Sequence, residues 1–234
     1  LCVITNGLLL DKEKLEWLKQ NRCGISLSFD GLWNNINRPL KNKSPSFPFY
    51  LKKKDLFHEF KITTCKVMIG PDSVPTLLEN FKFFVDEFDF PIPDFSLVRD
   101  NIWSWDDVEL FKQNLTTVAD EVISRFNSGK IATIGLFKLM LLDIFMAAKR
   151  GKRPQGCFAG CSGVGYLPDG VFYPCARYGS EKGYPIFDTK STVHFMDNYN
   201  KLKQPKFCDP RAYKACDNCE IRLYCNGGCN KSFH

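Results

Sequence analysis

Apolar and polar residues alternate along the first hundred residues in a regular order. The run 1–4 is apolar, residues 11–20 place apolar side chains on one helical face, and residues 23–29 alternate apolar with polar. Each strand-like run is followed by a turn that contains a glycine, Gly7 or Gly31. Strand, helix and strand in this order are typical of a βαβ unit, so we predict parallel pairing of the two strands.

The same order recurs further along the chain. Residues 60–69, 75–88 and 90–98 have the patterns of a strand, a helix and a strand, and residues 108–126 predict a second long helix. Residues 32–56 are rich in Asn and Pro, and we expect a long excursion with little regular structure. The alternation predicts an α/β layer or a partial barrel, because no repeat of fixed period is present.

The longest apolar run, residues 131–148, contains Lys138 and Asp143 and is too short for a clean membrane span of about 20 residues. We therefore predict a buried helix and no membrane partner. The net charge of +6 comes from 32 basic and 26 acidic residues spread along the chain. No basic stripe is present, so we expect no nucleic-acid partner.

Cysteines divide the chain. Three of the 11 lie before residue 157, and the other eight lie between Cys157 and Cys229. We predict three parts: a first domain over 1–129, a helical bridge over 130–156, and a Cys-rich module over 157–234. The early cysteines fall on strand-like runs and are expected to be buried free thiols: Cys2, Cys23 and Cys65.

The Cys-rich module has the spacing of a metal site. Four thiols occur in fourteen residues as Cys216-x2-Cys219-x5-Cys225-x3-Cys229. Upstream, a hairpin turn at 167–170 between two short strands separates Cys157 from Cys175. Thiolates bind both zinc and iron–sulfur clusters, and spacing does not separate the two. Disulfides are the least favoured alternative, because no secretion signal opens the chain.

Polar residues also follow the predicted strands, at Asn6, at Ser28 and Asp30, and at residues 99–100. In parallel α/β sheets this edge positions loops for chemistry. Taken singly, each Asn-Gly or Asp-Gly pair is equally typical of an ordinary turn.

The two motif sets together resemble radical S-adenosylmethionine (AdoMet) enzymes with a SPASM extension. The C-terminal Cys strings, with Asn226-Gly227-Gly228 inside the last one, are similar to the SPASM domain. The strings Ile4-Thr5-Asn6-Gly7 and Ser26-Leu27-Ser28-Phe29-Asp30-Gly31 resemble the third and fourth strands of the family's barrel. The resemblance implies part of a (β/α)6 partial TIM barrel followed by a small Cys-rich SPASM-like domain.

The resemblance also implies an AdoMet site. Ser28 and Arg38 would contact the cofactor, with Arg38 binding the methionyl carboxylate through two parallel hydrogen bonds. Asn6 and Asp30 would shape the same pocket. Lys66, Arg99 and Asp100 are candidates for lining the cavity, although surface or ion-paired positions explain them equally well.

The implied metal groups are auxiliary 4Fe–4S clusters. One would take Cys157, Cys175 and Cys229, with Cys161 as the fourth ligand. A second would take Cys216, Cys219 and Cys225. Its fourth ligand would be Cys208 or His234, or would lie beyond the end of the given sequence, or the cluster would keep an open coordination position.

The family's AdoMet-cleaving C-x3-C-x2-C loop has no counterpart in this sequence. Because Leu1 opens the run that resembles the third barrel strand, we expect the first two βα units to precede it in the natural protein. The chain as given is expected not to cleave AdoMet.

The resemblance implies an oxidoreductase that matures peptides, in which a 5′-deoxyadenosyl radical abstracts hydrogen from a ribosomal peptide or protein. Expected partners are that substrate, with or without a leader peptide, and an electron donor such as flavodoxin or ferredoxin; the expected location is the cytoplasm. Sulfatase-maturing relatives carry an Asp where this chain has Ala176, so formylglycine formation is the less favoured alternative. The other alternative is a non-catalytic binding module held together by zinc or iron–sulfur sites.

Overall fold

A computed structural model describes residues 1–98, 102–150, 163–180 and 184–191, together with residues 159, 193, 194, 197, 200 and 217–220. The chain divides into two compact units, Leu1–Leu139 and Met140–His234. Each unit is described by itself.

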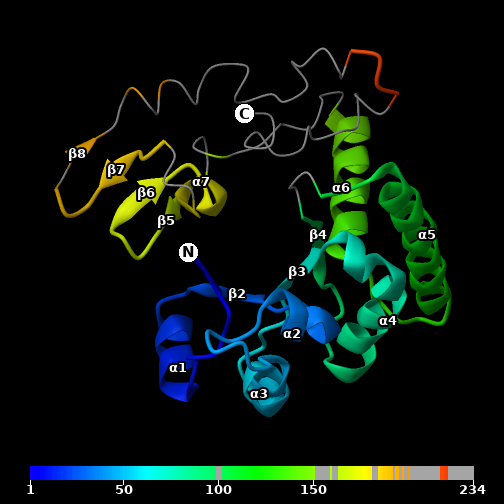
Figure 1. The fold of residues 1–234 in the computed structure, drawn as a ribbon, viewed down its shortest axis with the longest axis horizontal. Coiled ribbons are helices and arrows are strands. Elements are labelled where there is room, and N and C mark those ends of the chain that lie inside the picture. The colour runs from blue at the N-terminus through cyan, green and yellow to red at the C-terminus, as the bar shows by residue number, and fades with distance from the viewer. Residues whose placement is uncertain are drawn as a thin grey trace. The chain divides into compact units, whose positions relative to one another are not determined.

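A four-stranded parallel sheet forms the centre of the first unit (Figure 1). Its strands are β1 (Cys2–Thr5), β2 (Gly24–Ser28), β3 (Cys65–Ile69) and β4 (Asp94–Leu97), and they lie side by side in chain order. Each neighbouring pair is parallel. The predicted α/β class and the parallel pairing of the first two strands are therefore confirmed.

Helices connect the strands and cover one face of the sheet. Asp11 begins the first helix by accepting a hydrogen bond from the Lys14 amide at 2.9 Å, and Ser104 caps the longest helix in the same way at 3.1 Å from Asp107 N. The helical elements of this unit are α1 (Lys12–Gln20), a 3₁₀ turn (Gly31–Trp33), α2 (Asn34–Asn37), α3 (Phe47–Glu59), a second 3₁₀ segment (Pro71–Thr76), α4 (Leu77–Lys82), a π-helical turn (Phe83–Glu87) and α5 (Trp105–Asn127). Helix α6 (Gly135–Arg150) begins in this unit and continues into the second.

The prediction of an irregular excursion over residues 32–56 is wrong. The segment contains α2 and most of α3, and Pro48 lies in the first turn of α3. A proline is tolerated there because the first amides of a helix have no partner within the helix. Sequence reasoning took a helix-starting proline for a helix breaker.

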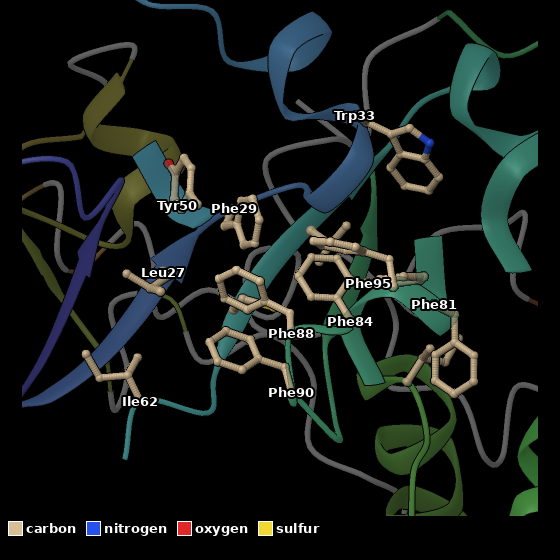
Figure 2. Packing of buried hydrophobic residues seen from close by; sticks show 14 of the residues in the cluster. Leu27, Phe29, Trp33, Tyr50, Ile62, Phe81, Phe84, Phe88, Phe90 and Phe95 are labelled. Carbon is tan, nitrogen blue, oxygen red and sulfur yellow. The ribbon is translucent and has the colours of Figure 1, made fainter. Parts of the chain in front are cut away.

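The core lies between the sheet and these helices, and it is rich in aromatic side chains. Phe29 stacks on Tyr50 of α3 with ring centroids 4.2 Å apart and meets Phe84 edge to face at 5.4 Å. Phe88 and Phe90 continue the cluster beyond the π-helical turn (Figure 2). This packing holds the end of β2 against α3 and the π-helical turn, so the segment that follows β2 has a well-packed base.

Two burial predictions fail. Helix α6 is present, but its apolar side chains between Leu139 and Phe145 are largely exposed, Leu141 by 68%. Of the early cysteines, only Cys65 is buried, whereas Cys2 is exposed and Cys23 is half-buried. Cys2 lies on β1, an edge strand of the described sheet. Among the described helices, none has the length and apolarity that crossing a bilayer requires.

The second unit contains a small antiparallel sheet. Its strands are β5 (Gly165–Tyr166), β6 (Val171–Tyr173), β7 (Phe187–Asp188) and β8 (Val193–His194), and helix α7 (Ala176–Ser180) follows β6. The predicted hairpin turn between β5 and β6 is confirmed. Gly170 supplies the positive φ of 90° that this turn needs.

Candidate cofactor site

The two faces of the parallel sheet differ in chemistry. Leu27, Cys65, Val67 and Phe95 point into the core and are almost fully buried. The alternate positions carry half-exposed and mostly polar side chains. We call these the polar face, and they are Ser26, Ser28, Lys66, Met68, Asp94 and Ser96. Parallel sheets are normally apolar on both faces, so a polar face marks the side on which chemistry is expected.

An ion pair crosses the polar face between β3 and β4. Lys66 Nζ lies 2.8 Å from Asp94 Oδ2, and the two side chains are 42% and 39% exposed. Lys66 is the register partner of Asp94 on one side and of Ser28 on the other. Ser28, Lys66 and Asp94 therefore form one row across three strands.

Asp30 lies just beyond β2 and is fully buried. Its carboxylate accepts hydrogen bonds from Arg38 Nε at 2.9 Å and Nη2 at 3.2 Å. The Met68 amide of β3 donates a third, at 2.9 Å. This charge is compensated on both oxygens, as a buried carboxylate requires.

Two buried asparagines fix the backbone around Asp30. Asn34 Oδ1 accepts from the Asp30 amide at 2.9 Å, and Asn80 Nδ2 donates to the Asp30 carbonyl at 3.0 Å. Asn80 Oδ1 also accepts from the Leu32 amide at 2.9 Å. Between them, Gly31 has a φ of +63° and lies so close to Asn80 that a Cβ would be 2.3 Å from its Oδ1. The turn after β2 is therefore held from both sides.

Sequence reasoning did not single out either asparagine. A signal for Asn80 was present, because Leu77, Asn80, Phe81 and Phe84 follow the i, i+3, i+4, i+7 stripe of a buried helix face. A polar residue in that stripe needs hydrogen-bond partners inside the protein.

The loop after β1 carries Asn6. This residue is exposed, and its Oδ1 accepts a hydrogen bond from the Leu8 amide at 3.2 Å. Lys53 of α3 donates to the carbonyls of Leu8 at 2.6 Å and Gly7 at 3.3 Å, and also to that of Leu10. Partial burial lowers the pKa of Lys53. Lys53 thus holds the loop after β1 through three hydrogen bonds to its carbonyls. Sequence reasoning did not assign this role to Lys53.

The sequence-predicted residues do not all meet. Asp30 and Arg38 are in direct contact, and Asp30 contacts β3 next to the polar face that carries Ser28. Tyr50 donates its hydroxyl to the Ser28 carbonyl at 3.2 Å. The side chain of Ser28 lies on the polar face, in register with Lys66. Asn6 makes no side-chain contact with these three among the described residues. Arg99 and Asp100 lie outside the described residues.

The donor set fits a zwitterionic cofactor such as AdoMet. Hydroxyl, ammonium and carboxylate groups occupy one row, and each faces outward from a rigid sheet. Arg38, however, already uses its Nε–Nη2 edge for Asp30, so the two parallel bonds expected to the methionyl carboxylate cannot be made through that edge.

Two predicted cluster ligands lie in the described part of the second unit. Cys175 is half-buried between β6 and α7, and its carbonyl accepts a hydrogen bond from the Gly179 amide at 3.1 Å. Gly165 of β5 passes so close that a Cβ would be 3.0 Å from the Cys175 carbonyl carbon. Cys219 is exposed. The remaining predicted ligands lie outside the described residues: Cys157, Cys161, Cys216, Cys225 and Cys229.

Within the described residues, no group of three or more His, Cys, Asp and Glu side chains could hold a metal ion. The cluster ligand sets therefore stay predictions. The lack of a side chain at Gly165 lets the backbone of Cys175 lie close to β5.

No protein family and no curated protein matches this chain. Solved structures do. The structure of anSMEcpe with bound AdoMet has a TM-score of 0.72 and 22% sequence identity, and the match covers 97% of this chain and 65% of that chain. The structure of anSMEcpe with bound AdoMet and Kp18Cys peptide has a TM-score of 0.70 and 22% sequence identity, and the match again covers 97% of this chain and 65% of that chain. The chain thus has the fold of these structures and spans 65% of the length of the solved chain.

Proposed function

We propose that this chain belongs to a radical AdoMet enzyme that modifies a peptide or protein. One observation carries the proposal: a rigid parallel sheet with a polar, half-exposed face, in a fold shared with a structure that holds AdoMet. A purely structural sheet would bury apolar side chains on both faces.

Within this proposal, Ser28 and the turn after β2 form the cofactor side of the site. Bound AdoMet would supply a 5′-deoxyadenosyl radical after one-electron reduction by an iron–sulfur cluster, and the protein contributes binding and orientation. Ser28 would donate its hydroxyl to the cofactor. Asp30 and Asn80 would act as positioning residues, because they hold the turn without facing the polar side. Asn6 would face the pocket from the neighbouring loop.

The Cys-rich part would hold the auxiliary 4Fe–4S clusters of a SPASM-like domain over 157–234, after a helical bridge over 130–156. Cys175 and Cys219 are its described candidate ligands. Supporting this assignment, thiolates are the ligands that iron–sulfur clusters require, and Cys175 is fixed by the close passage of Gly165.

A peptide or protein is the proposed substrate class. Two of the similar solved structures contain bound peptides, Kp18Cys and Cp18Cys. anSMEcpe is an anaerobic sulfatase-maturating enzyme, which keeps formylglycine formation as the second candidate. Against it stands Ala176 at the start of α7, since a methyl group cannot serve as the base that follows this cysteine in sulfatase-maturing relatives. The proposed electron donor is a flavodoxin or ferredoxin.

Calorimetric titration of the chain with AdoMet tests the cofactor part of the proposal. We expect saturable binding, weakened about tenfold in Ser28→Ala because one hydrogen bond to a charged group is lost. Ser44→Ala is the matched control and should bind as the wild type does, because this half-buried serine lies in the loop before α3 and donates its hydroxyl to Asn42 Oδ1 at 2.7 Å. Absence of saturable binding to the wild type would overturn the proposal.

Titration with the Kp18Cys peptide separates the two candidate substrates. Binding of this peptide would favour the sulfatase-maturase alternative. No binding, in a protein that does bind AdoMet, would favour another peptide or protein substrate.

A further inference from the structure

We infer that helix α5 of the first unit is the interface of a homodimer, in which it packs antiparallel against α5 of a second copy of this chain. The partner is therefore a second molecule of the same protein. The inference is independent of the proposed function, because it concerns a side of α5 that faces away from the core and not the polar face of the sheet.

Helix α5 uses one side for the core of the first unit. The core-facing residues recur every three or four positions, and they are Phe111, Leu115, Val118 and Val122. The helix also lies against α4 (Figure 1). This spacing is that of one stripe on a helix, so the core accounts for a single side of α5.

A second apolar stripe runs along α5 and is exposed. At its two ends, Trp105 is 88% exposed and Phe126 is 71% exposed. Between them, Val108 is 42% exposed and Ile123 is 57% exposed. At about 100° per residue, all four side chains lie within about 60° of one another around the helix axis. We call these four residues the outer stripe. A continuous apolar stripe on an exposed surface marks an interaction site.

The outer stripe has the same pattern in both directions along the helix. Trp105 and Phe126 lie at equal distances from the midpoint of the helix, and so do Val108 and Ile123. When two such helices lie antiparallel about a two-fold axis through this midpoint, Trp105 of each copy meets Phe126 of the other. Val108 meets Ile123 in the same way. A two-fold interface requires a surface that is complementary to itself, and the outer stripe meets this requirement.

The charges near the middle of α5 favour the antiparallel arrangement. Lys112 and Ala119 share the same midpoint, so Lys112 of each copy crosses the small side chain of Ala119 of the other. The exposed Asp120 follows Ala119 and offers the ammonium group a carboxylate on the second copy. Within its own chain, Lys112 lies 3.4 Å from Glu109, and both side chains are well exposed. A parallel pairing would instead place Lys112 against Lys112, which is unfavourable.

The length of the outer stripe sets the strength of the dimer. From Trp105 to Phe126 the stripe is about 32 Å long, at a rise of about 1.5 Å per residue. One helix pair of this length buries less than the roughly 1,600 Å² of a standard interface. We therefore expect a reversible dimer with a Kd on the order of 10 µM.

Sedimentation equilibrium of the wild type at about 1–200 µM measures this dimer. Val108→Glu and Ile123→Lys each place an unpaired charge against an apolar side chain at both ends of the interface, and both positions are exposed in the single chain. We expect each variant to weaken association about 100-fold, tenfold at each end. Leu110→Glu is the matched control, because Leu110 is 36% exposed and lies on the opposite side of α5 from Val108. This control should associate as the wild type does.

An equimolar mixture of the Val108→Glu and Ile123→Lys variants should dimerise again. In the mixed pair, one end joins the two introduced charges and the other end keeps the original contact between Val108 and Ile123. Restored association also shows that both variants fold. A wild type that stays monomeric at about 200 µM, a dimer that neither substitution weakens, or a mixture that stays monomeric would overturn the inference. None of these results bears on AdoMet binding, so the proposed function is tested separately.

Discussion

Arg38 donates two hydrogen bonds to the carboxylate of Asp30, although the two residues are separated by a short helix and only Asp30 is fully buried. The pair fixes the segment between β2 and α3. Because Asp30 also accepts from the Met68 amide, the same carboxylate fastens β2 to the end of β3. The buried carboxylate of Asp30 therefore contributes both to the stability of the fold and to the geometry of the candidate site.

Replacing Arg38 by methionine should destabilise the protein by about 3 kcal/mol, because a buried carboxylate loses its cation. Denaturant unfolding measures this change. The double variant Arg38→Met with Asp30→Asn should recover much of the loss, since no buried charge remains. Lys41→Met, an exposed cation of the same segment, is the control. A loss in the single variant no larger than in this control would contradict the account.

Replacing Gly31 by alanine should cost far more than replacing Gly129. Both glycines have positive φ, +63° and +82°, so both substitutions carry a conformational cost of about 1–2 kcal/mol. Only at Gly31 would the new Cβ also meet Asn80 and Phe84, which adds about 1–3 kcal/mol for overpacking. Equal free energies of unfolding in the two variants would show that the Asn80 contact is not tight.

Lys53→Met should loosen the loop after β1. Three carbonyls of that loop would lose their donor, and we expect hydrogen exchange at the Leu10 amide, which bonds to Gly7 O at 3.1 Å, to speed up about tenfold. Lys52→Met changes an exposed neighbour on the same helix and should leave exchange unchanged. If both variants exchange alike, Lys53 does not fasten the loop.

Stability should fall as the pH rises above about 9, because burial raises the pKa of the Cys65 thiol well above its ordinary value of 9.0. Above that pH the unfolded chain loses the thiol proton while the native state retains it, so unfolding becomes easier by up to about 1.4 kcal/mol per pH unit. Cys65→Val cannot titrate and should flatten this dependence in urea unfolding measured from pH 8 to 10. An unchanged slope would mean that Cys65 titrates alike in both states. Burial of Tyr50 raises its pKa as well and adds a similar fall above about pH 10 in both proteins.

Much of the sheet could be predicted, because strands β1 to β4 are short runs with apolar residues at alternate positions, separated by helical stripes, and a period of two or of 3.6 residues is visible in the local sequence. Helix α3 could not, because Pro48 signals a break unless its place in the first turn is known. The exposure of α6 could not either, since an apolar composition does not say what packs against a helix.

The sequence was sufficient to predict which residues lie in the candidate site, and insufficient to predict how they contact one another. The resemblance placed Ser28, Asp30 and Arg38 in one region, and the pairing of Arg38 with Asp30 emerged only from the fold. Asn80 and Lys53 act on residues more than 40 positions away in the chain, a distance at which no local pattern carries information.

Iron, acid-labile sulfide and zinc, counted per chain after anaerobic reconstitution, test the central claim most directly. The account predicts about four to eight irons with matching sulfide in the wild type, a clear loss in Cys175→Ala, and no loss in Cys2→Ala, an exposed thiol of the first unit. One or two zinc ions without sulfide would contradict it, and would mean that these cysteines hold a fold and carry no electrons.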